Sequence, residues 1–227
     1  MRHLGQVDAE RERRARLPAL AAAVESLKLY QQQRFSHTYA DLLESPRYGP
    51  GSRFFLDELY GPRDFSERDA QFARVVPALV RLFPEEIVDT VDTLAQLHAV
   101  SESLDSAMAT HLPGPVVDPS AYIQAWQATG RAADREAQIA LTLQVGAALD
   151  QYTRKPLLRH TLRAMRGPAR AAGLGALQNF LEAGFETFRA MRGADEFLSL
   201  VGRRERELAS ALFNSKPLDA AALQQLP

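Results

Sequence analysis

The sequence predicts an all-α fold, a single-domain bundle of about eight helices around a buried apolar helix near residues 168–192. Apolar residues recur at the i, i+3, i+4 spacing of a helix along most of the chain, and no stretch alternates as a strand does. Proline, glycine and capping residues stand at the ends of these stretches. The stretch 168–192 is apolar nearly all round, which is typical of a buried helix.

The helix signals divide the chain into three regions. Residues 1–17 are expected to form a charged lead-in, within which residues 8–16 alternate in charge and are expected to be solvated. Residues 18–213 form the predicted bundle domain, and residues 214–227 a polar tail. The sequence LPGPVVDP at 112–119 is the strongest break in the chain, and it is either a surface loop or a hinge between two subdomains.

Each predicted helix has a local start or stop signal. Proline at a first helical position marks four of the starts. Ser66 with Asp69 three residues later favours another start, and Gly130 is a typical stop. In chain order, helices are expected over residues 18–43, 53–61, 66–83, 84–111, 120–128, 134–153, 156–167, 168–192 and 195–213.

The composition limits the chemistry. The chain has no cysteine, which excludes disulfides, thiolate zinc sites, iron–sulfur ligation and a cysteine nucleophile. The N-terminal segment has no apolar core of a secretory signal, and the longest apolar run is far shorter than a membrane span. We therefore expect a soluble, cytoplasmic protein.

A net charge of −1 conceals two blocks of opposite sign. Residues 82–130 hold seven acidic side chains and no Lys or Arg, whereas residues 151–181 hold six basic side chains and no Asp or Glu. Separated charges create a directed field that selects partners.

Three ionisable residues, His98, Glu102 and Asp105, follow one another at i, i+4 and i+7 on the line where an apolar stripe began. Their spacing lets them meet, and a histidine beside carboxylates can act as a ligand or a proton shuttle. The alternative is that they are solvated or hydrogen-bonded to a neighbouring arginine. The chain has no Glu-x-x-His and no His-Glu-x-x-His pattern and only five histidines, so neither a metal site nor a cofactor is predicted.

A second candidate site lies near the start of the helix at Ser66. Backbone N–H groups at a helix start attract anions, so side chains there can line a ligand pocket. Its members are Tyr60, Arg63, Asp64 and Arg68. The alternative is architectural, with aromatic residues anchoring a turn while Asp64 or Ser66 caps the helix.

The phrase FFLDELYGPRDFSERDAQF, together with the later LHAVSESLD, resembles an uncharacterised family of proteobacterial proteins marked by FFLxELYGPxDFxxRD. The likeness covers most of residues 20–215. The resemblance implies no activity and no catalytic residues.

Arg159, Arg163 and Arg166 fall on one helix face, opposite in sign to Glu85, Asp89 and Asp92. Arginines suit nucleic acid, but the chain is near neutral and only one aromatic residue is interleaved, so nucleic acid is not expected. The basic face is expected to dock on the acidic helix 85–105, either of the same chain or of a second copy.

These observations favour a non-enzymatic helical protein that acts through protein–protein contacts or self-association, with a homodimer expected. The alternative is a ligand-binding protein or enzyme, haem-oxygenase-like or metal-dependent, with its site at His98, Glu102 and Asp105. Glycines in the 168–192 helix suggest this alternative, because haem-oxygenase-like bundles lay a glycine-bearing helix over a flat ligand.

Overall fold

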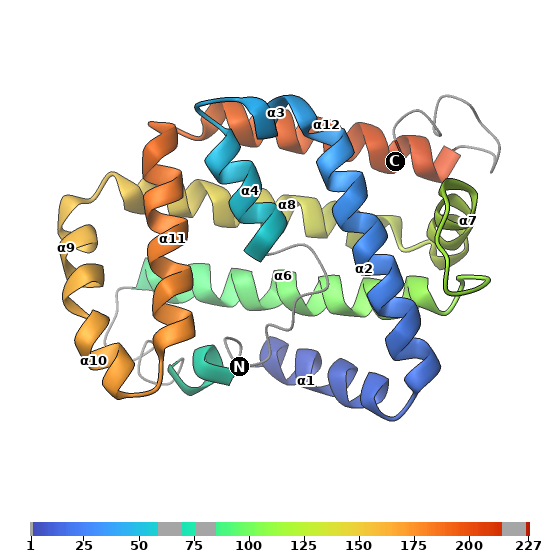
Figure 1. The fold of residues 1–227 in the computed structure, drawn as a ribbon, viewed down its shortest axis with the longest axis horizontal. Helices are drawn as coiled ribbons and strands as arrows, with labels where there is room; N and C mark the ends of the chain where they lie inside the picture. Colours follow the sequence, from blue (N-terminus) through green and yellow to red (C-terminus); the bar gives the residue numbers. More distant parts are fainter. Residues whose placement is uncertain (1, 59–69, 76–84, 215–225) are drawn as a thin grey trace.

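The computed structural model describes residues 2–58, 70–75, 85–214 and 226–227, which are almost entirely helical and contain no strand (Figure 1). The all-α prediction is confirmed. Residues 70–75 are helical, and the rest of the helix expected over 66–83 lies outside the described residues. The other described helices are α1 (Arg2–Ala15), α2 (Pro18–Thr38), α3 (Ala40–Glu44), α4 (Gly49–Glu58), α6 (Glu85–Ala109), α7 (Pro119–Thr129), α8 (Ala132–Thr153), α9 (Pro156–Ala164), α10 (Arg166–Ala171), α11 (Gly175–Met191) and α12 (Asp195–Asn214).

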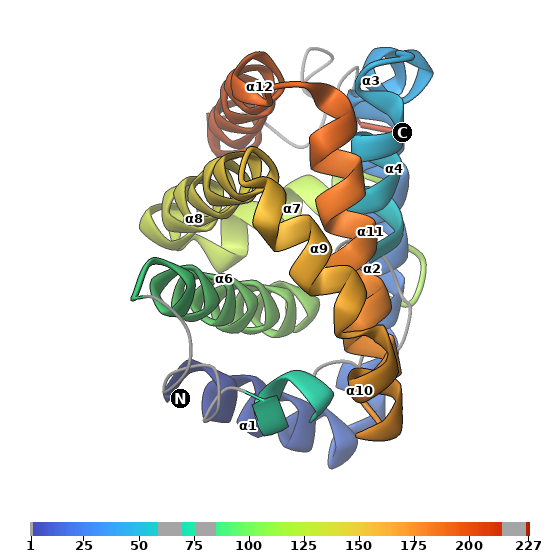
Figure 2. The same ribbon diagram turned by 90° about the vertical axis from the view of Figure 1, so that its left-hand side faces the viewer.

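The helices form two crossed layers. In Figures 1 and 2, α1, α6, α8 and α12 lie side by side in one layer, and α2, α4 and α11 run across it. The connections α7, α9 and α10 lie at the two ends. The inner positions of the first layer therefore belong to α6 and α8.

Two apolar clusters fill the space between the layers. One joins α2, α6, α7 and α12 and is built around Leu27, Met108 and Ile123, all fully buried. The other joins α2, α3, α4, α11 and α12 and is rich in aromatic rings, among them Phe188 and Phe197. Leu226 of the tail is also buried, against the first cluster.

Local signals explain α7 well. The Asp118 side chain accepts a hydrogen bond from the backbone N–H of Ala121 at 2.8 Å, and Pro119 occupies the first turn. Gly130, at φ +62°, ends the helix in a backbone conformation that favours glycine. Residues 112–118 connect α6 to α7, and the hinge there stays a prediction.

The expectation that 168–192 is one buried central helix is wrong. The chain turns at Gly173, φ +69°, between α10 and α11, and α11 buries one face and leaves Leu181 41% exposed. The apolar pattern misled because much of it is alanine and glycine, as at Ala183 and Ala190, which are exposed. Such small side chains bury little area and do not require a core position.

The N-terminal region also differs from the prediction. Residues 2–15 form α1, which lies along α6 and buries Val7, so the region is part of the bundle rather than a solvated lead-in. The count of about eight helices is too low for the same reason. It is also too low because α3 and α10 are separate short helices. None of the described helices combines the length and the apolar character needed to cross a membrane.

Candidate functional site

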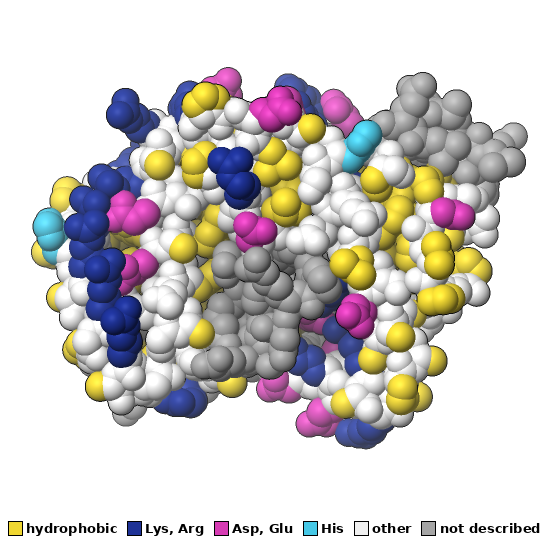
Figure 3. All heavy atoms as spheres, in the orientation of Figure 1, with side chains coloured by type: hydrophobic (Ala, Val, Ile, Leu, Met, Phe, Trp, Pro, Cys, Tyr) yellow, Lys and Arg dark blue, Asp and Glu magenta, His cyan; other side chains and the backbone are white. Residues whose placement is uncertain are grey.

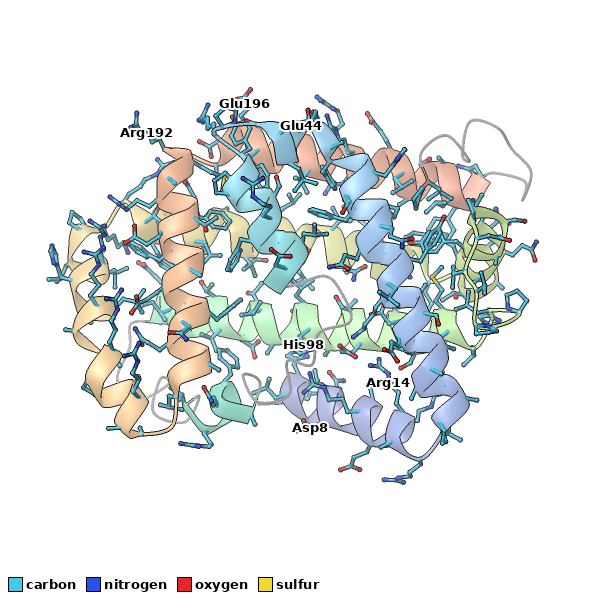
Figure 4. The ribbon with its side chains drawn as sticks, in the orientation of Figure 1. Asp8, Arg14, Glu44, His98, Arg192 and Glu196 are labelled. Atoms are coloured by element: carbon cyan, nitrogen blue, oxygen red, sulfur yellow. The ribbon has the colours of Figure 1, made fainter. Side chains whose placement is uncertain are left out.

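The predicted trio lies in the second half of α6, on the side that faces α1 and α2. Figure 4 shows His98 between α6 and α1, with Asp8 and Arg14 on the facing helix. His98, Glu102 and Asp105 form, with Arg14 of α1 and Lys28 of α2, a group that we call the buried ionic cluster.

Glu102 is the centre of this cluster and is only 6% exposed. Arg14 pairs with its carboxylate and also donates from Nη2 to its backbone carbonyl at 2.7 Å. Lys28 Nζ donates to Oε1 at 2.8 Å, and His98 Nε2 lies 3.5 Å from the same oxygen. One glutamate therefore joins three helices.

Asp105 is equally buried but more weakly paired. Gln31 Nε2 donates to its Oδ1 at 3.2 Å, and Lys28 Nζ lies 3.9 Å from its Oδ2. Lys28 thus stands between the two carboxylates, closer to Glu102.

The environment moves the two carboxyl pKa values in opposite directions. Burial raises the pKa of Glu102, but the hydrogen bond from His98 and the charges of Lys28 and Arg14 outweigh it and bring the pKa below its usual range. Burial likewise raises the pKa of Asp105, where the charge of Lys28 lowers it less and the neighbouring Glu102 raises it further.

The structure brings the three residues together, and Glu102 is hydrogen-bonded to a neighbouring arginine, as in the alternative that the sequence left open. Their carboxylates are occupied by Arg14, Lys28 and Gln31. Among the described residues, no group of three or more His, Asp or Glu side chains is arranged to hold a metal ion. The hydrogen bonds and ion pairs of the cluster hold α1 and α2 against α6.

The second candidate region is a set of four exposed or half-exposed arginines that we call the arginine row: Arg159, Arg163 and Arg166 of the α9–α10 segment and Arg189 of α11. Figure 3 shows basic side chains in a column along the edge between α9 and α11, with two acidic patches beside it. The sequence predicted the first three residues as one face, and they do lie together.

The arginine row meets two glutamates of α11. Arg159 Nε donates to Glu186 Oε1 at 2.8 Å, and Arg163 Nη2 lies 3.2 Å from the same oxygen. Arg189 Nε donates to Glu186 Oε2 at 3.0 Å.

The second glutamate, Glu182, pairs with Arg166. Arg166 Nε donates to Glu182 Oε1 at 2.7 Å. Hydrogen bonds from these arginines are the main cause that lowers the pKa of both glutamates. Four guanidinium groups thus share two carboxylates.

The prediction that the basic face docks on the acidic helix of the same chain is wrong. Only Lys155 makes such a contact among the described residues, with Nζ 3.0 Å from Glu86 Oε2. The three acidic residues expected at the interface, Glu85, Asp89 and Asp92, are exposed, and no ion pair to another described residue is seen for them. We call these three the acidic face.

A cleft of about 510 Å³, which the sequence did not indicate, opens where α8, α11 and α12 meet the α3–α4 connection. Seven of its nine lining residues are charged, and we call it the arginine cleft after four of them: Arg47, Arg154, Arg189 and Arg192. Sequence reasoning missed it because its members come from three separate stretches of the chain, at 47, 150–154 and 189–196. The visible signal was two arginines beside turns, Arg47 after Pro46 and Arg192 before Gly193.

Tyr60, Arg63, Asp64 and Arg68 lie outside the described residues, so their predicted anion pocket stays a prediction.

No curated protein and no solved structure matches this chain. The sequence model of one family does match, over residues 10–219, and that family is described only as a domain of unknown function. The match agrees with the expectation of an uncharacterised family that covers most of the sequence. The chain belongs to the family Domain of unknown function DUF8198.

Proposed function

We propose that this is a non-enzymatic, cytoplasmic helical protein that self-associates through two complementary charged surfaces, the arginine row and the acidic face. The observation that carries the proposal is the charge balance of the arginine row. Among the described residues its four positive charges meet two negative ones, Glu182 and Glu186, so two positive charges remain.

The acidic face supplies the opposite charge. Glu85, Asp89 and Asp92 are exposed on the first half of α6. The link between Lys155 and Glu86 holds the start of α9 next to the start of α6, and Figures 1 and 2 show both at the same end of the molecule. A two-fold axis at that end can set each arginine row on the acidic face of the other copy, which is the geometry of an isologous dimer.

The internal pairs of the arginine row do not prevent this contact. Exposed ion pairs contribute only about 0–1 kcal/mol each, so the arginines can exchange partners at little cost. Opposed charged surfaces raise association rates and fix the orientation of the two molecules. The proposed contact is therefore sensitive to salt, because exposed charges are screened within about 8 Å at physiological ionic strength.

The test uses two charge-reversed variants. The first is Arg159→Glu/Arg163→Glu/Arg166→Glu, and the second is Glu85→Arg/Asp89→Arg/Asp92→Arg. Each alone places like charges at both contacts and is expected to be monomeric by light scattering at low salt. An equimolar mixture restores opposite charges at both contacts and is expected to give a heterodimer of dimeric mass.

Arg203→Glu is the matched control, since it reverses an exposed arginine on α12 whose side chain is 63% exposed. It should keep the parent mass. The variant with the reversed acidic face is expected to fold normally, because its three residues form no ion pair with another described residue that the substitutions would break. A parent protein that is monomeric at about 20 mM salt, or a mixture that stays monomeric, overturns the proposal.

A further inference from the structure

The arginine cleft lies at the end of α11, apart from the buried ionic cluster. Its volume, about 510 Å³, is within the roughly 300–1,000 Å³ typical of small-molecule sites. Its walls are polar, which suits a charged ligand rather than an apolar one.

Two of its arginines are held in place by the fold. Arg47 donates from Nε to the carbonyl of Met191 at 2.9 Å and from Nη2 to the carbonyl of Gly193 at 3.2 Å. Its Nη1 also lies 3.3 Å from Glu196 Oε2. These three bonds fix the guanidinium of Arg47 against the turn between α11 and α12.

Arg154, just after the end of α8, is also held in place. It pairs with Asp150, which is 3% exposed and also accepts a hydrogen bond from the backbone N–H of Ala194 at 3.1 Å. The carboxylates of Asp150 and Glu196 are thereby used to orient arginines and to tie the turn. Arg189, the fourth arginine of the lining, pairs with Glu186 outside the cleft, so the other three arginines face three acidic residues and the charges of the cleft balance.

Arg192 is different from the others. Its side chain is exposed, and that side chain makes no hydrogen bond or ion pair to another described residue. Its φ is +54°, a left-handed conformation that glycine adopts far more readily than arginine. The fold thus keeps an unengaged guanidinium on the cleft wall at a position where glycine would be the less strained residue.

We propose that the arginine cleft binds a small molecule that carries phosphate or carboxylate groups. Arg192 makes the primary contact, and the fixed Arg47 and Arg154 add preorganised guanidinium groups beside it. A guanidinium presents five N–H donors in a planar fork that matches the oxygens of either group. The volume of the cleft leaves room for a polar ligand larger than a lone inorganic ion.

The experiment measures binding of pyrophosphate and of citrate by calorimetry, each at constant ionic strength, to the full chain. We expect saturable binding of at least one, and the preferred anion identifies the chemical source. In Arg192→Gly the dissociation constant should rise tenfold or more, because a charge-assisted hydrogen bond is lost. The melting temperature of the same variant should stay equal or rise, because glycine relieves the left-handed backbone.

Arg131→Gly is the matched control. Arg131 is the other described non-glycine residue at positive φ, +57°, and it does not line the cleft. That variant should bind both anions as the parent does. Arg192→Gly should also keep the parent oligomeric mass, which separates this inference from the proposed dimer. Unsaturable binding of both anions by the parent, or equal binding by parent and Arg192→Gly, overturns the proposal.

Discussion

The buried ionic cluster and the arginine row are both built from arginines and carboxylates on neighbouring helices, but they satisfy their charges differently. In the cluster, the Glu102 side chain is 8% exposed and has partners from α1, α2 and its own helix. In the row, Glu186 is 39% exposed and is shared by three arginines. The first places each charge against a specific partner, and the second leaves charge in excess.

The difference follows from how well each charge is hydrated. A buried charge loses its hydration and needs close, hydrogen-bonded partners, so α1, α2 and α6 must meet in one register. An exposed charge keeps its hydration, so an imbalance costs little and remains available to another molecule. The buried ionic cluster therefore stabilises the fold, whereas the arginine row presents charge at the surface.

The largest expected effect tests the buried side of this comparison. Glu102→Gln removes the charge that faces Arg14 and Lys28. It leaves Arg14 without its carboxylate partner and Lys28 with the more distant Asp105, so the free energy of unfolding should fall by about 3–5 kcal/mol. Urea denaturation measures it. Glu207→Gln is the control, because that side chain is 66% exposed and 4.0 Å from Arg203. Its loss should stay below about 1 kcal/mol. Equal losses would remove the distinction between the two regions.

An intermediate effect comes from Asp105→Asn. The pKa of Asp105 is raised in the folded protein, so its contribution to stability is present below its unfolded pKa and is lost as pH rises through the folded value. The asparagine variant cannot ionise, so it does not lose this contribution. Its free energy of unfolding should stay within about 1–3 kcal/mol of that of the parent. The difference should shift in favour of the variant as pH rises from about 4 to 7.

Glu102→Gln should show the opposite pH dependence. The folded pKa of Glu102 is lowered, so its contribution is present above its unfolded pKa and is lost as pH falls. The deficit of the Gln variant should therefore shrink on acidification. Parallel pH profiles for the two variants would contradict the opposite pKa shifts.

The smallest effect is expected in the arginine row. The side chain of Arg163 is 46% exposed. When Arg163 is replaced, Glu186 still pairs with Arg159 and Arg189. Arg163→Gln should change the free energy of unfolding by less than about 0.5 kcal/mol, as measured by urea denaturation. A loss above about 2 kcal/mol would show that the row is part of the core architecture instead of a free surface.

Sequence reasoning succeeded where the deciding interactions are local. Gly130 ends α7 as expected, because a stop signal acts over a few residues. The spacing of His98, Glu102 and Asp105 placed them on one side of α6, because helical periodicity needs no tertiary information. The 168–192 stretch was misjudged because an alanine is compatible with both a buried and an exposed position.

The partners of the site residues could not be predicted in this way. Arg14 reads as part of a charged lead-in, and only the fold brings it to Glu102, 88 residues away. Arg47 meets the carbonyl of Met191, 144 residues away, to build one wall of the arginine cleft. No periodic pattern joins such distant positions.

By itself, the sequence determined that the chain is helical, where most helices begin and end, and that opposite charges are segregated along it, because these depend on backbone propensity and residue order. Only the tertiary structure decided which charges are buried and paired and which remain in excess. Those outcomes depend on the register of one helix against another, which packing of the whole chain sets.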